Sequence, residues 1–379
     1  MTIQLDGADA LLMIGDSVRN ADLYYATRFR APDPFVFVWT HTARIAMVSN
    51  LELDRARSQA KVDQVLSSAH YEKQLRAGGC QVPAFRDLVL ALLRDLGLKK
   101  LLVPADFPLD PADFLRQSGI QLELAPTPLF AQRQIKTPEE IEAIRKAMRA
   151  AEQGMQVAVE AIGAAVVRDR ILYCDGEPLT SEHLRRLIHL ELMSLDCTAE
   201  HTIAACGNDA CDPHQEGSGP LRAGETIIID IFPRDSASGY FGDITRTVCK
   251  GAAPAAVKDL YELVHCGQQL ALERICAGAD GRQIHQAIHD LFSRSGRDTY
   301  EKDGHMQGFF HSTGHGLGLE IHEAPRLGPR GDVLKTGQVV TVEPGLYYPG
   351  LGGVRIEDVV LVEDDGCDNL ATFPKFLEV

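Results

Sequence analysis

Two pairs of apolar segments, each pair joined by a turn-rich stretch, constrain this chain more than any other feature of its sequence. The first pair covers residues 225–230 and 240–248, and the second covers residues 338–343 and 354–360. Isoleucine, valine and threonine dominate these segments, and glycine, proline and serine gather between them, which predicts two antiparallel strand pairs. Each of the four segments carries at least one acidic residue at its end or near its centre, among them Asp230, Asp243, Glu343 and Glu357.

These acidic residues can face each other across their own strand pair. In an antiparallel hairpin the numbers of directly opposed residues have a constant sum. Asp230 opposite Asp243, and Glu343 opposite Glu357, both place the turn inside a turn-rich stretch, and the second turn centres on Gly350. Opposed side chains in such a pair lie about 5 Å apart, so two carboxylates there destabilise the sheet unless a positive charge lies between them. A metal ion would supply that charge.

A third segment, Phe309–Glu323, contains three of the chain's 13 histidines, His311, His315 and His322. The glycines between them disfavour a helix and indicate tight turns or a close backbone approach. The alternation over residues 317–323 predicts a strand. Four carboxylates and one imidazole suit two divalent ions such as manganese, and cobalt, iron or zinc also fit this donor set. The alternative is a histidine-rich turn without a ligand, beside strand-end acids that pair with nearby cations.

Composition narrows the class of protein. The 379 residues predict two or three domains, and 45 % hydrophobic with 24 % charged residues is typical of a soluble enzyme. A net charge of −15 argues against a nucleic-acid partner. The nine cysteines show no zinc-finger or CxxC spacing, so reduced thiols are expected. Neither a signal peptide nor a membrane span is expected from the short apolar run near the N-terminus, which predicts a cytoplasmic protein.

The first part of the chain alternates short apolar runs with a helical pattern. Strands are expected at residues 11–14, 35–39, 44–48 and 99–104, and a helix is expected from Phe85. This alternation indicates an α/β layer. No catalytic constellation is evident there, so this part is expected to serve packing, assembly or access to a site elsewhere.

A strong helix start marks the boundary between the parts. Thr137 can cap the helix, Pro138 takes its first position, and Glu140 completes a capping box. Apolar residues then recur every three or four positions from Ile141 to Ile162, which predicts one buried helical stripe. The predicted domains are therefore residues 1–132 and 133–379. Further helices are expected at residues 181–193, 254–276 and 281–293.

The motifs together resemble the pita-bread metallopeptidases of family M24, specifically the branch of Xaa-Pro dipeptidases (prolidases) and Xaa-Pro aminopeptidases. The resemblance covers residues 133–379, whereas the first domain resembles the family's N-terminal domain only in length and position. The implied fold is α+β, with a C-terminal pita-bread (creatinase/aminopeptidase-like) domain preceded by a smaller α/β domain. The motifs that carry the resemblance are Ile228-Ile229-Asp230, Gly242-Asp243-Ile244-Thr245-Arg246-Thr247, Gly314-His315-Gly316-Leu317-Gly318, His322-Glu323, Val342-Glu343-Pro344-Gly345 and Gly353-Val354-Arg355-Ile356-Glu357-Asp358.

The resemblance implies a role for each matching residue. Glu343 would be the general base as well as a metal ligand. Arg355 would contact the metal ligands and keep them in place. His214 would contact the scissile peptide, while His311 and His322 would shape the proline pocket and donate to the substrate. Arg326 matches an arginine that binds the substrate carboxylate in some dipeptidases. The implied ligands of two divalent ions, most simply Mn²⁺, are Asp230, Asp243, His315, Glu343 and Glu357.

The implied reaction is hydrolysis of the peptide bond before proline, by a hydroxide that bridges the two metal ions. The substrate would be a small peptide with proline at the second position, and the protein would be a homodimer whose first domain borders the partner's cleft. Three alternatives are a metal-free amidinohydrolase of the creatinase type, a methionine aminopeptidase and a non-catalytic peptide-binding protein. The sequence leaves dipeptidase and aminopeptidase open. It departs from the family at Phe232, where many members have a glycine-containing turn, which puts the shape of the pocket in question.

Overall fold

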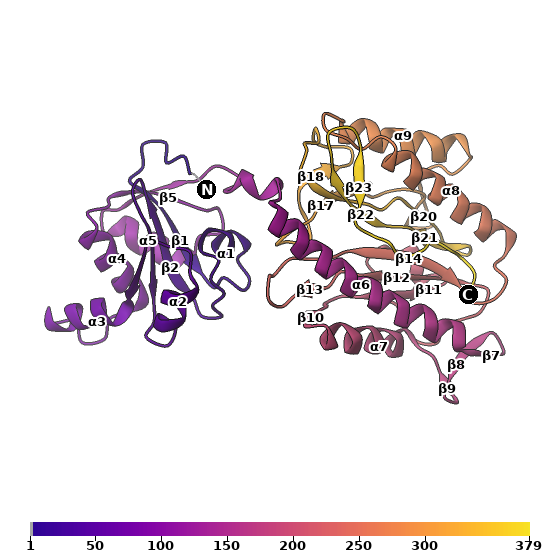
Figure 1. Ribbon diagram of the computed structural model, residues 1–379, viewed down its shortest axis with the longest axis horizontal. Helices are drawn as coiled ribbons and strands as arrows, with labels where there is room; N and C mark the ends of the chain where they lie inside the picture. The colour runs from indigo at the N-terminus through magenta and orange to yellow at the C-terminus, as the bar shows by residue number, and fades with distance from the viewer. Residues whose placement is uncertain (1–2) are drawn as a thin grey trace. The chain divides into compact units, whose positions relative to one another are not determined.

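A computed structural model describes residues 3–379, and the chain divides into two units, Met1–Arg133 and Gln134–Val379. The first unit contains one sheet with its own helices (Figure 1). Its elements are β1 Ala10–Gly15, α1 Ala21–Thr27, β2 Phe35–Thr40, β3 Arg44–Val48, α2 Leu53–Gln59, β4 Gln64–Ser67, α3 Ser68–Ala77, α4 Phe85–Asp95, β5 Lys100–Val103, α5 Leu109–Gln117 and β6 Gln121–Leu124.

The sheet of the first unit is mixed, with the strand order β4-β3-β2-β1-β5-β6. The central pairs β1–β2 and β2–β3 are antiparallel, and the outer pairs are parallel. Apolar side chains of the strands, such as Leu12, Val38 and Leu101, pack in one cluster with Val89 and Leu92 of α4. The strands expected here and the helix from Phe85 are confirmed.

The long helix α6 is the first main element of the second unit, and the short helix η1 precedes it at the boundary. Thr137 accepts a hydrogen bond from the N–H of Glu140, and the Glu140 carboxylate accepts one from the N–H of Thr137, so the capping box is confirmed. The helices of this unit are η1 Ala131–Gln134, which straddles the boundary, α6 Pro138–Ala164, α7 Ser181–Ser194, η2 Asp209–Cys211, α8 Ala255–Leu272 and α9 Gly281–Arg294.

The described strands of the second unit form two three-stranded sheets, β11-β12-β14 and β7-β8-β9, a five-stranded sheet, β18-β17-β19-β22-β23, and two-stranded ribbons. Their bounds are β7 Val166–Arg168, β8 Ile171–Cys174, β9 Glu177–Pro178, β10 Cys197–Thr198, β11 Ile203–Cys206, β12 Thr226–Ile231, β13 Arg234–Asp235, β14 Ile244–Cys249, β15 Tyr300–Lys302, β16 His305–Gln307, β17 Gly314–Gly316, β18 Glu323–Leu327, β19 Val339–Val342, β20 Gly345–Tyr348, β21 Gly352–Arg355, β22 Asp358–Val362 and β23 Cys367–Asn369.

Helices cover the strands of the second unit from two sides. Within this unit, α6 packs against α7 and against β12 and β14, whereas α8 packs against β19, β20 and β21 (Figure 1). Gly154 allows the close approach of α6, because a Cβ there would lie 3.3 Å from Ile188 of α7 and 3.5 Å from Ile231 of β12. Over residues 3–379, the helices are all too short or too polar to span a membrane.

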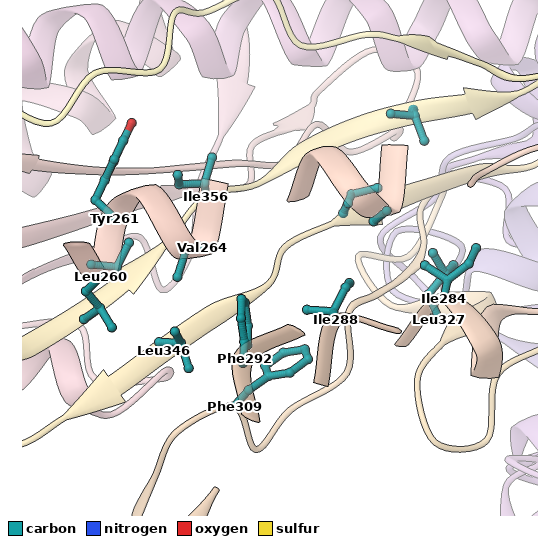
Figure 2. Packing of buried hydrophobic residues seen from close by; sticks show 14 of the residues in the cluster. Leu260, Tyr261, Val264, Ile284, Ile288, Phe292, Phe309, Leu327, Leu346 and Ile356 are labelled. Atoms are coloured by element: carbon teal, nitrogen blue, oxygen red, sulfur yellow. The ribbon is translucent and has the colours of Figure 1, made fainter. Parts of the chain in front are cut away.

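The core beneath α8 and α9 is the part that supports the site. Figure 2 shows Leu260 and Val264 of α8 beside Ile356, and Phe292 of α9 beside Phe309. Gly267 lets the two helices meet, since a Cβ there would lie 2.8 Å from the Phe292 ring. This cluster fixes the strands that lead into the acidic residues.

The register of the second strand pair is confirmed. Val342 pairs with Asp358, so the next residues inward, Glu343 and Glu357, face each other. The same register continues through β20 and β21, where Tyr348 pairs with Gly352 around the turn at Gly350.

The predicted register of the first strand pair is wrong by two residues, because Asp230 pairs with Thr245 rather than Asp243. The cause is the turn, which closes with a hydrogen bond from the N–H of Asp235 to the carbonyl of Tyr240. The Asp235 carboxylate accepts hydrogen bonds from the N–H and the hydroxyl of Ser238, at 2.7 and 2.6 Å. This side-chain interaction centres the turn one residue further along the chain than expected. Because the shift is even, Asp230 and Asp243 remain on one face of the pair.

The strand expected over residues 317–323 is also absent. Only Gly314–Gly316 is extended, the register shifts after His315, and residues 318–322 form bends before β18. The N–H of Gly318 donates to the carbonyl of Glu320, and the carbonyl of Gly318 accepts from the N–H of Phe241. These bonds fold the segment into a tight loop, which periodicity alone does not reveal.

Candidate metal centre and peptide cleft

A cleft of about 870 Å³ in the second unit is lined by every candidate residue that the sequence pointed to. The acidic residues lie where apolar strands end or begin. Asp230 is in β12, Asp243 directly precedes β14, Glu343 directly follows β19, and Glu357 directly precedes β22. The remaining lining residues from the sequence analysis are His214, His311, His315, His322, Arg326 and Arg355.

The centre of the cleft is formed by Asp243, His315 and Glu357, whose potential ligand atoms all lie within 4.8 Å of one another. His315 Nε2 is 3.8 Å from Asp243 Oδ2 and 3.3 Å from Glu343 Oε1. His315 Nδ1 lies 3.1 Å from the carbonyl oxygen of Gly316, which can only accept, so Nδ1 carries the proton. The lone pair of Nε2 therefore faces the carboxylates.

The pKa shifts of these residues show that the cluster disfavours negative charge that no cation compensates. Burial, with neighbouring carboxylates adding to it, raises the pKa of Asp243 and of Glu357 well above the usual range. Burial raises the pKa of Glu343 to about 8, although Arg355 opposes the shift. Burial lowers the pKa of His315 to about 3, so its imidazole is neutral at pH 7 and supplies no compensating charge.

The one cation in contact with these carboxylates within residues 3–379 is Arg355. Its Nη2 donates to Asp230 Oδ2 at 2.7 Å, while Asp230 Oδ1 is buried and has no hydrogen-bond partner in that part of the chain. A buried carboxylate oxygen without a donor is costly. Oxygen and imidazole donors that converge in this way fit divalent ions such as Mn²⁺, Co²⁺, Fe²⁺ or Zn²⁺. The residues present therefore fit the metal that the acidic strand pairs predicted.

Two threonines hold carboxylates of this cluster, and the sequence analysis gave neither threonine a role. Thr245 Oγ1 donates to Glu357 Oε2 at 2.7 Å, and Thr341 Oγ1 donates to Glu343 Oε1 at 3.2 Å. The available signal was strand alternation, since Thr341 lies two residues before Glu343 and therefore on the same face. Such hydrogen bonds orient metal ligands before a metal binds.

Tyr347 was also missed, and it links two predicted residues. Arg355 Nη1 donates to the Tyr347 hydroxyl at 3.0 Å, and this hydroxyl lies 2.9 Å from His311 Nε2. His311 Nδ1 lies 2.8 Å from the carbonyl of Ser312 and so carries the proton, which makes Nε2 the acceptor for Tyr347. Both nitrogens of His311 are thus used within the protein. The expectation that His311 donates to the substrate is not supported by these contacts.

The outer part of the cleft offers groups to a peptide. His214 and His322 are exposed there, and the His322 ring lies 4.4 Å from the His315 ring. Within the described chain, the Arg326 guanidinium makes no hydrogen bond or ion pair, and Asp332 accepts a hydrogen bond from the backbone N–H of Arg326. The apolar lining consists of Ile203, Pro213, Phe232, Phe310 and Ile321.

Comparison with known proteins places the chain in a family. Residues 142–364 match the model of metallopeptidase family M24. The Xaa-Pro dipeptidase of Pyrococcus furiosus is 35 % identical over 238 residues, 62 % of either chain, so the match spans just under two thirds of that relative's length. The X-Pro aminopeptidase of Thermotoga maritima has the same fold, with a TM-score of 0.82 at 24 % identity over 98 % of both chains. The Xaa-Pro dipeptidase of Bacillus anthracis gives 0.81 at 25 % identity, over 98 % of this chain and 96 % of that one. The expected pita-bread fold is confirmed, and the chain belongs to metallopeptidase family M24.

Proposed function

We propose that this chain is a dinuclear metallopeptidase that hydrolyses the peptide bond preceding proline. The observation that carries the proposal is the buried cluster of four carboxylates and one imidazole, which opens into a peptide-sized cleft. The lone pairs of this cluster outnumber the hydrogen-bond donors that reach them. Relatives with the same fold are named Xaa-Pro dipeptidase and X-Pro aminopeptidase. A metal-free amidinohydrolase would have no use for this cluster, and a non-catalytic binding protein would have no need for it.

Five residues would hold two divalent ions, of which Mn²⁺ suits the oxygen-rich donor set best. When bound, such ions lower the pKa of water and polarise the carbonyl of the scissile bond. Arg355, Thr245 and Thr341 keep the carboxylates oriented before any ion arrives. The ligands in this proposal are Asp230, Asp243, His315, Glu343 and Glu357.

The remaining chemistry belongs to side chains around the cluster. Glu343 takes a proton from the attacking water and delivers it to the leaving proline nitrogen. His214 and His322, both exposed to the cleft, donate hydrogen bonds to the oxygen that develops negative charge. The acidic centre attracts the free α-amino group of the substrate, and the apolar lining, including Phe310, accommodates the proline ring.

Arg326 favours dipeptides among the possible substrates. Its guanidinium lines the cleft and is not engaged by a carboxylate of residues 3–379, and Glu323, the nearest acid along the chain, binds Lys136 Nζ at 2.7 Å. A planar guanidinium in this position can bind the terminal carboxylate of an Xaa-Pro dipeptide through two hydrogen bonds.

The decisive experiment measures metal and activity together. The wild-type chain should bind two Mn²⁺ ions and hydrolyse Xaa-Pro peptides. Asp243→Ala and Glu357→Ala should each lose at least one ion and nearly all turnover. Unchanged metal content and turnover in both variants would contradict the assignment. Rates on Xaa-Pro and Xaa-Pro-Xaa peptides, measured with Mn²⁺ present, separate a dipeptidase from an aminopeptidase.

A further inference from the structure

A buried glutamine interrupts the apolar face of α8. Gln268 lies one helical turn after Val264, and neither residue is exposed to solvent. The face to which both belong packs on the strand pair that carries Glu343 and Glu357, and Figure 2 shows Val264 close to Ile356 there. Packing alone would call for an apolar residue at this position.

The amide of Gln268 reaches the strand pair at the point where its ladder is interrupted. The pairing of β19 with β22 ends at Val342, and the pairing of β20 with β21 begins at Gly345. Gln268 Nε2 donates to the carbonyls of Val342 and Ile356, both at 3.2 Å. These carbonyls belong to the residues that directly precede Glu343 and Glu357.

The two peptide planes that carry the acids are therefore held from both sides. The N–H of Glu343 donates to the carbonyl of Thr313 at 2.8 Å, and the N–H of Glu357 donates to the carbonyl of Thr245 at 3.0 Å. Gln268 holds the carbonyl at the opposite edge of each plane. A peptide unit is rigid, so bonds at both edges fix the direction in which the following side chain leaves the backbone.

Gln268 reaches both carbonyls while its own oxygen stays unpaired within the described chain. Its Oε1 is buried and has no hydrogen-bond partner within residues 3–379. A buried amide oxygen without a donor destabilises a fold. An apolar side chain of similar size would avoid that cost but would remove the donor to the carbonyls of Val342 and Ile356. The amide satisfies two buried carbonyls where the ladder is interrupted, and both carbonyls belong to the peptide planes that carry the two acids.

We infer that Gln268 is a positioning residue, which sets the separation of Glu343 and Glu357 and thereby the affinity of the centre for divalent ions. The inference rests on the proposed function, because it assumes that both carboxylates bind metal. It assigns the role to a residue on α8 that does not line the cleft.

The test compares Gln268→Leu with Gln269→Leu. Gln269 is the next residue on α8, is only half-buried, and its amide contacts His265 rather than the strands, so it is a matched control. Metal-free samples of the full chain are titrated with Mn²⁺ in competition with a chromophoric chelator, and electron paramagnetic resonance distinguishes isolated from paired Mn²⁺. Gln268→Leu should bind Mn²⁺ about 10- to 100-fold more weakly and lose the paired signal, which is the range seen when a partner that orients metal ligands is removed. Gln269→Leu should behave as wild type.

The melting temperature of each metal-free variant separates positioning from folding. A positioning role requires weaker Mn²⁺ binding in a variant whose metal-free form melts close to the wild type. Gln268→Met, which keeps the length of the side chain, is measured in parallel in case the leucine variant does not fold. Wild-type Mn²⁺ affinity in any folded variant of Gln268 would overturn the inference. If the wild-type chain bound no Mn²⁺, the proposed function would fail, and the inference would fail with it.

Discussion

At the scale of single residues, the buried carboxylates of the centre repel one another unless protons or metal ions neutralise their charge. Asp243, Glu343 and Glu357 all have pKa values raised by burial in the metal-free chain, that of Glu343 to about 8. A carboxyl whose pKa is higher in the folded than in the unfolded state stabilises the fold below the unfolded pKa. That contribution is lost as the pH rises through the folded value.

We therefore expect metal-free protein to lose stability between about pH 4.5 and pH 8, with Glu343 contributing on the order of a few kcal/mol. Thermal unfolding in the presence of a chelator, at intervals across this range, measures the effect. Glu343→Gln should flatten the pH dependence, and Mn²⁺ should restore stability at pH 8 because it replaces the missing protons. A melting temperature in chelator that stays constant across the range would show that the repulsion is absent.

Arg326 tests the choice of substrate at the same scale. Arg326→Ala removes a two-pronged anchor for a dipeptide carboxylate, so it should cost about 2 to 4 kcal/mol, or about 30- to 1000-fold in kcat/KM, on Xaa-Pro. A tripeptide carries its carboxylate beyond that position and should be affected little. Arg330→Ala, four residues away and exposed, is the control. Equal small losses on both substrates would show that Arg326 is a surface cation that does not bind the substrate carboxylate.

At the scale of elements, the glycines around His315 allow strands to pack closely rather than to adopt unusual dihedral angles. Gly314 in β17 has no positive φ, yet a Cβ there would lie 1.9 Å from the carbonyl oxygen of Thr341 in β19. Gly163 on α6 is the contrasting case, since a Cβ there would meet nothing within 4 Å and its φ is not positive.

These two glycines give opposite predictions. Gly314→Ala must push β17 away from β19, and overpacking of this kind costs about 1 to 3 kcal/mol, together with a loss of Mn²⁺ affinity as His315 moves. Gly163→Ala should stabilise the chain by about 0.4 to 1 kcal/mol, because it restricts the unfolded state without a clash. Chemical denaturation of both variants measures the difference. A Gly314→Ala variant as stable as wild type would mean that the strands have room.

A helix or strand register can be predicted from the sequence when residues close to it in the chain determine it. The capping box of α6 and the register that opposes Glu343 to Glu357 follow from nearby residues, and both were predicted. The first strand pair was misregistered because a side chain, Asp235, reshapes its turn. The contacts of Tyr347 and Gln268 could not be predicted, since each depends on residues that only the tertiary fold brings together.

At the scale of the whole molecule, the two units differ in what they contribute. Every proposed metal ligand, with the side chains that orient them, lies in Gln134–Val379, which has its own buried core. The first unit has a separate core, and none of its described residues, 3–133, lines the cleft. The proposed metal centre therefore needs residues of one chain only, and packing, assembly or access to the site remain the roles expected of the first unit from its sequence.

This division leads to a prediction about assembly. We expect light scattering to give a mass about twice the 41.5 kDa of one chain, because the first unit is proposed to border the cleft of a partner. Dilution below the dissociation constant of the dimer should lower the turnover per site, while each chain keeps its Mn²⁺, since the proposed ligands all come from one chain. Parallel measurement of mass, turnover and bound Mn²⁺ over a dilution series tests both parts. Full turnover at a monomeric mass would exclude a catalytic role for the dimer, and Mn²⁺ released together with dissociation would show that the partner supports the centre after all.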